Sequence, residues 1–244
     1  MTDRASHHKY VYAIVPASAK MPPDLRGLDG AVLHLISNRE LAAITSPVEP
    51  GALATTKHVF QHERTLEAVR ETVPALPVRF GTILPDDASV VAALEDGYDS
   101  LIADLDRLGD KVEMGVTAVA AAAPSPPAPA DAAAAAGGPG SRYLRARVEE
   151  YRREESDRRA AEQMGRDLDR VLIPPALERR RLADREPARL RAGYLIDPAS
   201  VPIFRERVER FRLSRPDLRV VLTGPWPPYT FVSKRGAQRT EGRT

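Results

Sequence analysis

Two histidines, His58 and His62, stand four residues apart in a stretch whose apolar spacing is helical. That spacing places both imidazoles on one helix face, as a two-histidine metal or haem site requires. Glu63 follows the second histidine, but no glutamate stands between the two, so the general base of the zinc-protease motif is missing. No third ligand is evident, and we expect a polar, partly exposed helix face with no metal and no cofactor.

Paired carboxylates are the next candidates for chemistry. Asp86 and Asp87 follow Pro85 at the start of a predicted helix, where capping and compensation of the helix dipole explain both residues. Asp104 and Asp106 are expected on a solvated helix face. The chain has no cysteine, and it lacks a glycine-rich phosphate loop and a nucleophile elbow. We therefore predict no catalytic residue and no enzyme activity.

Two proline-bounded aromatic segments stand out instead. The first, residues 77–82, carries Arg79 and Phe80, and the second, residues 224–232, carries Trp226 and Tyr229. Prolines fix the backbone, so such segments lose little entropy on ordering, while their aromatic rings offer large apolar areas. The second segment either caps the core of the second half or forms a contact surface. A charge at position 79 is expected to pair with a carboxylate or to mark a docking surface.

Charge and hydropathy narrow the class of protein. The 244 residues include 36 basic and 34 acidic side chains, and this balance argues against a nucleic-acid partner, which usually meets a basic excess on one face. No apolar run approaches the roughly 20 residues that cross a bilayer, and the polar first residues do not form a signal peptide. We expect a soluble, cytoplasmic protein without a membrane partner.

The elements that position these residues alternate between strand and helix periodicity. Both halves contain strands that can pair antiparallel and helices that can cover them, which is typical of an α+β protein with ferredoxin-like halves. Most positions of the segment 78–84 are apolar, which predicts a central strand. The predicted strands are 10–15, 31–37, 41–45, 78–84, 111–120, 192–196 and 218–223, and the predicted helices are 54–73, 90–108, 141–173 and 202–211.

The predicted domains follow from this order. Residues 1–110 form an N-terminal ferredoxin-like α+β domain, and residues 111–232 form a C-terminal α+β domain with a long charged helix. Residues 121–140 are almost entirely alanine, proline and glycine, which predicts a flexible insertion. Residues 233–244 form a polar tail. In the long helix, glutamates and aspartates alternate with arginines, which favours intrahelical ion pairs, a charged protein partner or self-association.

Four segments together resemble the gas vesicle accessory proteins of the GvpL/GvpF family. They are the opening strand 10–14, the run Leu-Pro-Val-Arg-Phe-Gly-Thr at 76–82, the strand start at 111–113 and the closing run Gly-Pro-Trp-Pro-Pro-Tyr-Thr-Phe-Val at 224–232. The resemblance spans residues 10–232, and the closing run is its most specific part. The insertion at 121–140 and the polar tail depart from the family pattern without touching these segments.

The resemblance implies a function in the assembly of gas vesicles. Proteins of this family are thought to bind the very hydrophobic major shell protein, together with other vesicle accessory proteins, and to act at the gas vesicle or at its nucleation. On this basis Arg79, Phe80, Trp226 and Tyr229 are predicted partner-binding residues. The alternative is an enzyme or a haem- or metal-binding protein on a ferredoxin-like scaffold, for which His58 or His62 would be the expected ligand.

Overall fold

The computed structural model describes residues 8–49, 55–120, 139–184 and 186–233. Most of the predicted insertion (121–138) and the tail from residue 234 lie outside these residues. The strands are β1 His8–Pro16, β2 His34–Asn38, β3 Leu41–Val48, β4 Leu76–Pro77, β5 Ile83–Leu84, β6 Val112–Ala120, β7 Ala176–Arg181, β8 Arg189–Ile196 and β9 Leu218–Trp226. The helices are α1 Thr56–Arg70, α2 Asp87–Asp96, α3 Tyr98–Leu108, α4 Pro139–Leu172 and α5 Val201–Ser214, with 3-10 turns η1 Leu28–Gly30 and η2 Pro198–Ser200.

The mixture of helices and two sheets confirms the α+β class. The contacts divide the chain into two units, of which the first combines Met1–Glu113 with Trp226–Thr244, and the second is Met114–Pro225. The second unit is therefore inserted into the sequence of the first. The sequence-based division differs at the C-terminal end, because it assigned residues up to 232 to the second half.

The sheet of the first unit has the order β2-β3-β1-β4, with β5 also paired to β1. Strand β3 lies between β1 and β2 and runs antiparallel to both, which is the split arrangement of a ferredoxin-like fold. Residues 17–33, with η1, connect β1 to β2 in place of the first crossover helix. Helix α1 supplies the second crossover, from β3 to β4.

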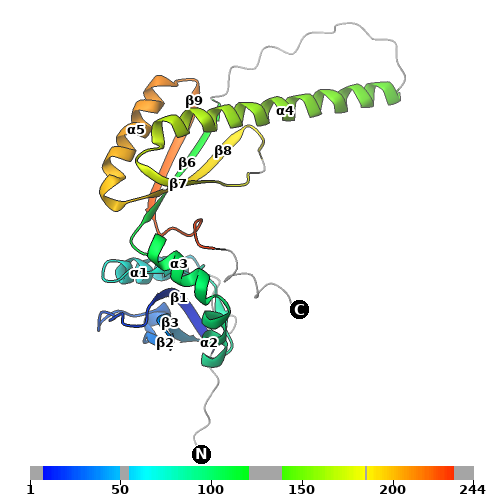
Figure 1. Cartoon of the computed structure of the whole chain (residues 1–244). Coiled ribbons are helices and arrows are strands. Elements are labelled where there is room, and N and C mark those ends of the chain that lie inside the picture. The colour runs from blue at the N-terminus through cyan, green and yellow to red at the C-terminus, as the bar shows by residue number, and fades with distance from the viewer. Residues whose placement is uncertain (1–7, 50–54, 121–138, 185, 234–244) are drawn as a thin grey trace, which may run out of the picture. The chain divides into compact units, whose positions relative to one another are not determined.

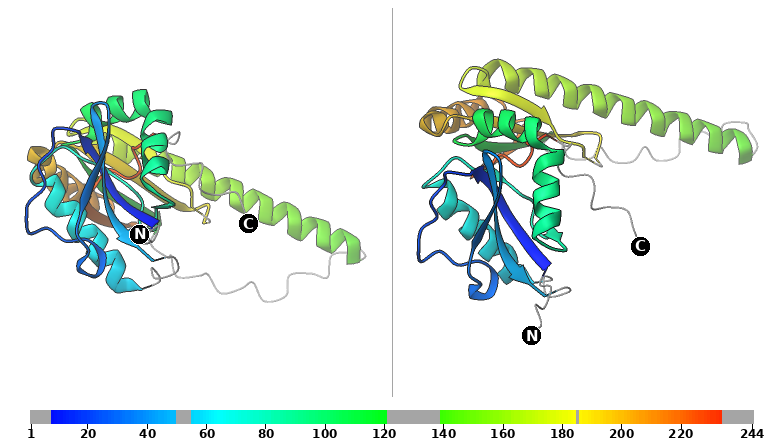
Figure 2. Two further views of the ribbon diagram at one scale, coloured as in Figure 1. Left: turned by 90° about the horizontal axis from the view of Figure 1, so that it is seen from below. Right: turned by 60° about the horizontal axis from the view of Figure 1, so that its bottom comes forward.

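Both faces of this sheet are covered. Side chains of successive strand residues point to opposite faces, and every residue from Tyr10 to Val15 of β1 is buried. Helix α1 packs on one face, while α2 and α3 contact β1, β2 and β3 from the other (Figure 2). The aromatic rings of β1 and the apolar side of α1 form one core cluster, which includes Tyr10, Tyr12, Leu66 and Val69.

Two predicted elements of the first unit were wrong in detail. The expected central strand 78–84 is not continuous: residues 78–82 form a turn between the two-residue strands β4 and β5, which pair with β1, and Gly81 in that turn has φ +86°. Only glycine adopts such a backbone at no steric cost. The expected helix 90–108 is broken at Gly97 into α2 and α3. Asp86 caps α2 as predicted, since its carboxylate accepts from the amide of Ser89.

The second unit contains the full β-α-β-β-α-β series, β6-α4-β7-β8-α5-β9, with sheet order β7-β8-β6-β9. The sequence-based order missed β7, because its run of three arginines at 179–181 does not resemble a buried strand. The edge position of β7 leaves room for these charges. Arg179 pairs with Asp169 of α4, which also accepts a hydrogen bond from the Tyr194 hydroxyl at 3.1 Å.

Helix α4 changes character along its 34 residues. Its C-terminal part packs through Ala161, Met164 and Leu168, all of which are buried. Its N-terminal part extends beyond the sheet of its own unit (Figure 1), and every side chain from residue 143 to 154 is exposed. The predicted intrahelical ion pairs are present, for example between Arg147 and Glu150. The apolar side chains of this helix are thus buried only in its C-terminal half.

Candidate functional site

The segment from Trp226 to Ser233 is fastened to the first unit by hydrogen bonds. The amide and hydroxyl of Thr230 donate to the Glu113 carboxylate at 2.9 and 2.6 Å. The Ser233 amide donates to the buried carboxylate of Asp104 at 2.6 Å, and Arg107 donates to the Phe231 carbonyl at 3.0 Å. Asp104 therefore has a structural function in the first unit, which corrects the expectation that it lies on a solvated face.

Tyr229 carries this segment into the core of the first unit. Its hydroxyl lies 3.1 Å from Nε2 of His62 and donates to Oε1 of Glu63 at 2.9 Å. On the other side of the imidazole, Nδ1 lies 2.8 Å from the Tyr10 hydroxyl. The Tyr10 hydroxyl in turn accepts from the amide of Gly81 at 3.2 Å. The segment that we expected to cap the second half or to form a contact surface thus completes the core of the first unit.

Aromatic packing holds the His62 ring between these partners. The ring stacks on Tyr12 with centroids 5.7 Å apart, and Phe80 meets it edge-on at 5.8 Å. The Tyr12 hydroxyl contacts the Ser46 hydroxyl at 2.9 Å and accepts from the Leu28 amide at 2.7 Å. Among the described residues, every buried side-chain nitrogen and oxygen has a hydrogen-bond partner, so the cluster costs little despite its polarity.

Burial sets the protonation states in this cluster. Loss of water around the imidazole lowers the pKa of His62 to about 4. A hydrogen bond with the backbone of Val78 acts in the opposite direction and raises this pKa, but by less. Burial raises the pKa values of the Tyr10 and Tyr229 hydroxyls. It also raises the pKa of Glu63, although the hydrogen bond from Tyr229 acts in the other direction. At neutral pH His62 is therefore an uncharged imidazole.

The four predicted partner-binding residues fall into two groups. Phe80 and Tyr229 pack against the core cluster and meet around His62. Arg79 and Trp226 point outward: Arg79 is exposed, and Trp226 is 52% exposed. Arg79 forms no ion pair with a carboxylate among the described residues, so the other expectation for this residue, a docking surface, stays a prediction.

His58 has its own partners at the start of α1. Its Nε2 lies 2.9 Å from the Asp29 carboxylate, and its Nδ1 lies 3.1 Å from the Thr55 hydroxyl. His58 and His62 are both buried, which corrects the expectation of a partly exposed polar face. Metal binding by either imidazole would break at least one of these hydrogen bonds. No cluster of three or more possible metal ligands occurs within the described ranges.

The contacts of His62 were not predicted from the sequence, although the sequence contains one signal for them. His62 precedes Leu66 by four residues and Val69 by seven, which places it on the apolar stripe of α1. A histidine there has to find partners inside the core. The two tyrosines of β1 lie two residues apart on the same face of the strand and are suitable partners.

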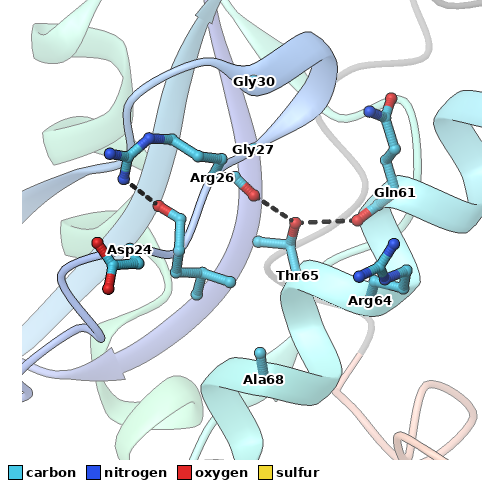
Figure 3. A pocket seen from close by; sticks show the side chains of 9 residues that line it. Asp24, Arg26, Gly27, Gly30, Gln61, Arg64, Thr65 and Ala68 are labelled. Carbon is cyan, nitrogen blue, oxygen red and sulfur yellow. Dashed lines mark hydrogen bonds between the residues drawn. The ribbon is translucent and has the colours of Figure 1, made fainter.

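A polar pocket of about 340 Å³ lies on the other side of α1, against the connection between β1 and β2 (Figure 3). Thr65 closes it by donating to the carbonyls of Arg26 and Gln61 at 3.1 and 2.9 Å. The guanidinium of Arg26 donates hydrogen bonds to the carbonyls of Pro23 and Leu25. The lining of the pocket offers the charged side chains Arg64 and Asp24, and no nucleophile stands next to a base among these lining residues.

The sequence and the fold were compared with known proteins. The family model described as "Gas vesicle synthesis protein GvpL/GvpF" matches residues 8–233. The chain is 31% identical over 257 residues to gas vesicle protein L of Streptomyces sp. (strain CB03234), covering 95% of this chain and 94% of the relative. It is 28% identical over 236 residues to gas vesicle protein F of the same strain, covering 91% and 98%.

Two crystal structures share the fold. Gas vesicle protein GvpF from Anabaena sp. PCC7120 matches with a TM-score of 0.67 at 19% identity, covering 93% of this chain and 99% of that one. GvpF from Microcystis aeruginosa matches with a TM-score of 0.66 at 20% identity and the same coverage. Within the described residues, none of the helices combines the length and apolar character that a membrane span needs.

Proposed function

The chain belongs to the GvpL/GvpF family of gas vesicle synthesis proteins, and from this premise we propose that it is an accessory protein that binds the hydrophobic major shell protein and supports vesicle nucleation or assembly. It acts in the cytoplasm and at the gas vesicle, with other vesicle accessory proteins as further partners. Arg79, Phe80, Trp226 and Tyr229 form the contact, with Arg79 and Trp226 touching the partner.

The observation that carries this proposal is an exposed tryptophan on a fastened segment. Trp226 is the only tryptophan of the chain and is 52% exposed, and the residues after it are held by Tyr229, Thr230 and Ser233. A large aromatic side chain displayed on an ordered backbone loses little entropy on binding, and such residues supply much of the energy of protein interfaces.

The chemistry of the partner follows from the same surface. A shell subunit with a large apolar area aggregates unless another protein covers that area. Trp226 supplies apolar contact, and the exposed guanidinium of Arg79 can pair with a carboxylate at the edge of the partner surface. In the second unit, the exposed stripe Leu144, Val148 and Tyr151 of α4 offers further apolar contact, at 63%, 49% and 68% exposure.

The contacts of the histidines weigh against the alternative of a haem or metal protein. Both ring nitrogens of His58 and of His62 are engaged in hydrogen bonds. Ligation of an iron or zinc ion needs a free, deprotonated nitrogen, so binding would have to break at least one of these hydrogen bonds. The alternative predicts an absorption band or stoichiometric metal in the purified protein.

Co-purification with the major shell protein tests the proposal. Trp226→Ala and Arg79→Ala are expected to reduce capture of the shell protein about tenfold each, as removal of a central interface side chain does. Leu213→Ala and Arg219→Ala are matched controls, since both side chains are exposed on the second unit. Full capture by the folded Trp226→Ala, Arg79→Ala double variant would show that the contact lies elsewhere.

A further inference from the structure

The imidazole of His62 joins the two segments that carry the exposed residues Arg79 and Trp226. Through Tyr10, His62 reaches the amide of Gly81, two residues after Arg79 in the turn between β4 and β5. Through Tyr229 it reaches the segment that begins at Trp226. These partners are 52 and 167 residues away from His62 in the sequence. No backbone pairing between the two segments is needed for this link.

The partners fix the direction of every hydrogen bond in the chain. The Tyr229 hydroxyl donates its one proton to Oε1 of Glu63, so toward His62 it can only accept, from Nε2–H. Because a neutral imidazole carries one proton, Nδ1 is then the acceptor and the Tyr10 hydroxyl donates to it, while the same hydroxyl oxygen accepts from the Gly81 amide. A neutral imidazole with its proton on Nε2 therefore satisfies both ends, whereas the opposite tautomer would require Tyr229 to turn its proton from Glu63 to Nε2.

We propose that His62 is a positioning residue that couples the turn carrying Arg79 to the segment carrying Trp226, through the directed series from the Gly81 amide to Tyr10, His62, Tyr229 and Glu63. The proposal rests on the proposed function only for the part that Arg79 and Trp226 play in binding. The coupling itself is a property of the first unit. Loosening one segment removes a partner from His62 and thereby loosens the other.

The imidazole is well suited to this task. It presents one donor and one acceptor on a rigid ring, and stacking on Tyr12 at 5.7 Å fixes the ring plane. The titratable groups that face it are Tyr10 and Tyr12 from β1, Glu63 from α1 and Tyr229 from the closing segment. With its proton on Nε2, the ring accepts a hydrogen bond from the Tyr10 hydroxyl and donates one to the Tyr229 hydroxyl, so the donor and acceptor roles of the two tyrosines depend on each other.

Amide hydrogen exchange in the full chain measures the coupling. The Gly81 amide reports the turn, and the Thr230 amide reports the closing segment. Tyr229→Phe keeps the ring and removes the hydroxyl, so exchange at Thr230 is expected to rise about tenfold, the effect of one lost hydrogen bond. If His62 couples the segments, exchange at Gly81 rises as well, by about threefold or more, although the Tyr229 hydroxyl bonds to His62 and Glu63 and not to the Gly81 amide.

Removing the imidazole separates coupling from simple packing. In a His62→Leu background, Tyr229→Phe is expected to leave Gly81 exchange unchanged, whereas a packing effect would persist and add. His34→Gln, at an exposed position of β2, serves as the control that leaves both amides unchanged. Nitrogen chemical shifts of the wild-type imidazole provide a measurement that needs no variant, and the expected state is a proton on Nε2.

The coupling proposal and the proposed function fail in different ways. A proton on Nδ1, or Gly81 exchange that does not respond to Tyr229→Phe, would overturn the coupling whether or not the shell protein binds. If the exchange data confirm the coupling while Tyr229→Phe and His62→Leu still capture the shell protein fully, His62 remains the link within the first unit. That result would place the binding contact away from Arg79 and Trp226.

Discussion

Acidification is expected to destabilise the first unit through His62. The pKa of this imidazole is about 4 in the folded chain because of burial, against an ordinary value of 6.5. Between these two pH values the unfolded chain binds a proton that the folded chain does not. The free energy of unfolding therefore falls as the pH is lowered from 6.5 to about 4, and below that this group causes no further loss.

The size of the loss follows from the same two values. One pH unit corresponds to 1.36 kcal/mol, so the full contribution of His62 is roughly 3 kcal/mol. That is a large share of the 5–15 kcal/mol that typically stabilises a protein. Glu63 acts in the opposite sense, because a carboxyl whose pKa is raised by burial takes up its proton in the folded state first. The two tyrosines have raised pKa values and do not titrate in this range.

Urea unfolding at pH 8, 6.5, 5 and 4 measures this dependence, with Trp226 emission as the probe of the first unit. The His62→Gln variant retains a donor and an acceptor but has no titrating ring. Between pH 8 and pH 4 its free energy of unfolding is therefore expected to fall by roughly 3 kcal/mol less than that of the wild type. The comparison is repeated in a Glu63→Gln background to remove the opposing carboxyl. Parallel curves for wild type and His62→Gln would refute the assignment of a low pKa to this residue.

Three further substitutions test the packing that supports the site. Gly27→Ala is expected to destabilise the first unit by about 1–3 kcal/mol in urea, since an added Cβ would collide with the buried Tyr12 hydroxyl; an unchanged midpoint would contradict this. Asp86→Ala removes the cap of α2 and should cost about 1 kcal/mol, whereas Asp86→Asn should largely preserve stability. Glu113→Ala leaves the Thr230 amide without its acceptor and is expected to raise its hydrogen exchange about tenfold; Glu178→Ala, on β7 of the second unit, should leave that exchange unchanged.

The sequence predicted the elements whose periodicity agrees with their final environment. Strand β1, the hairpin β2–β3, helix α1 and strand β6 lie where alternation or helical spacing placed them. Strand β7 escaped prediction because of its three arginines, of which Arg179 is paired with Asp169 of α4. The break between α2 and α3 at Gly97 also escaped, since the apolar spacing continues across the glycine.

Composition and local motifs determined the α+β class, the cap at Asp86 and the ion pairs of α4, because each depends on neighbours within a few positions. Only the tertiary structure decided where the closing segment belongs and why His62 is buried. Hydrogen bonds over 166 and 167 residues join Tyr229 to Glu63 and His62. Contacts of this kind leave no local pattern, because only the folded first unit brings a donor and an acceptor so far apart in the sequence into the same core.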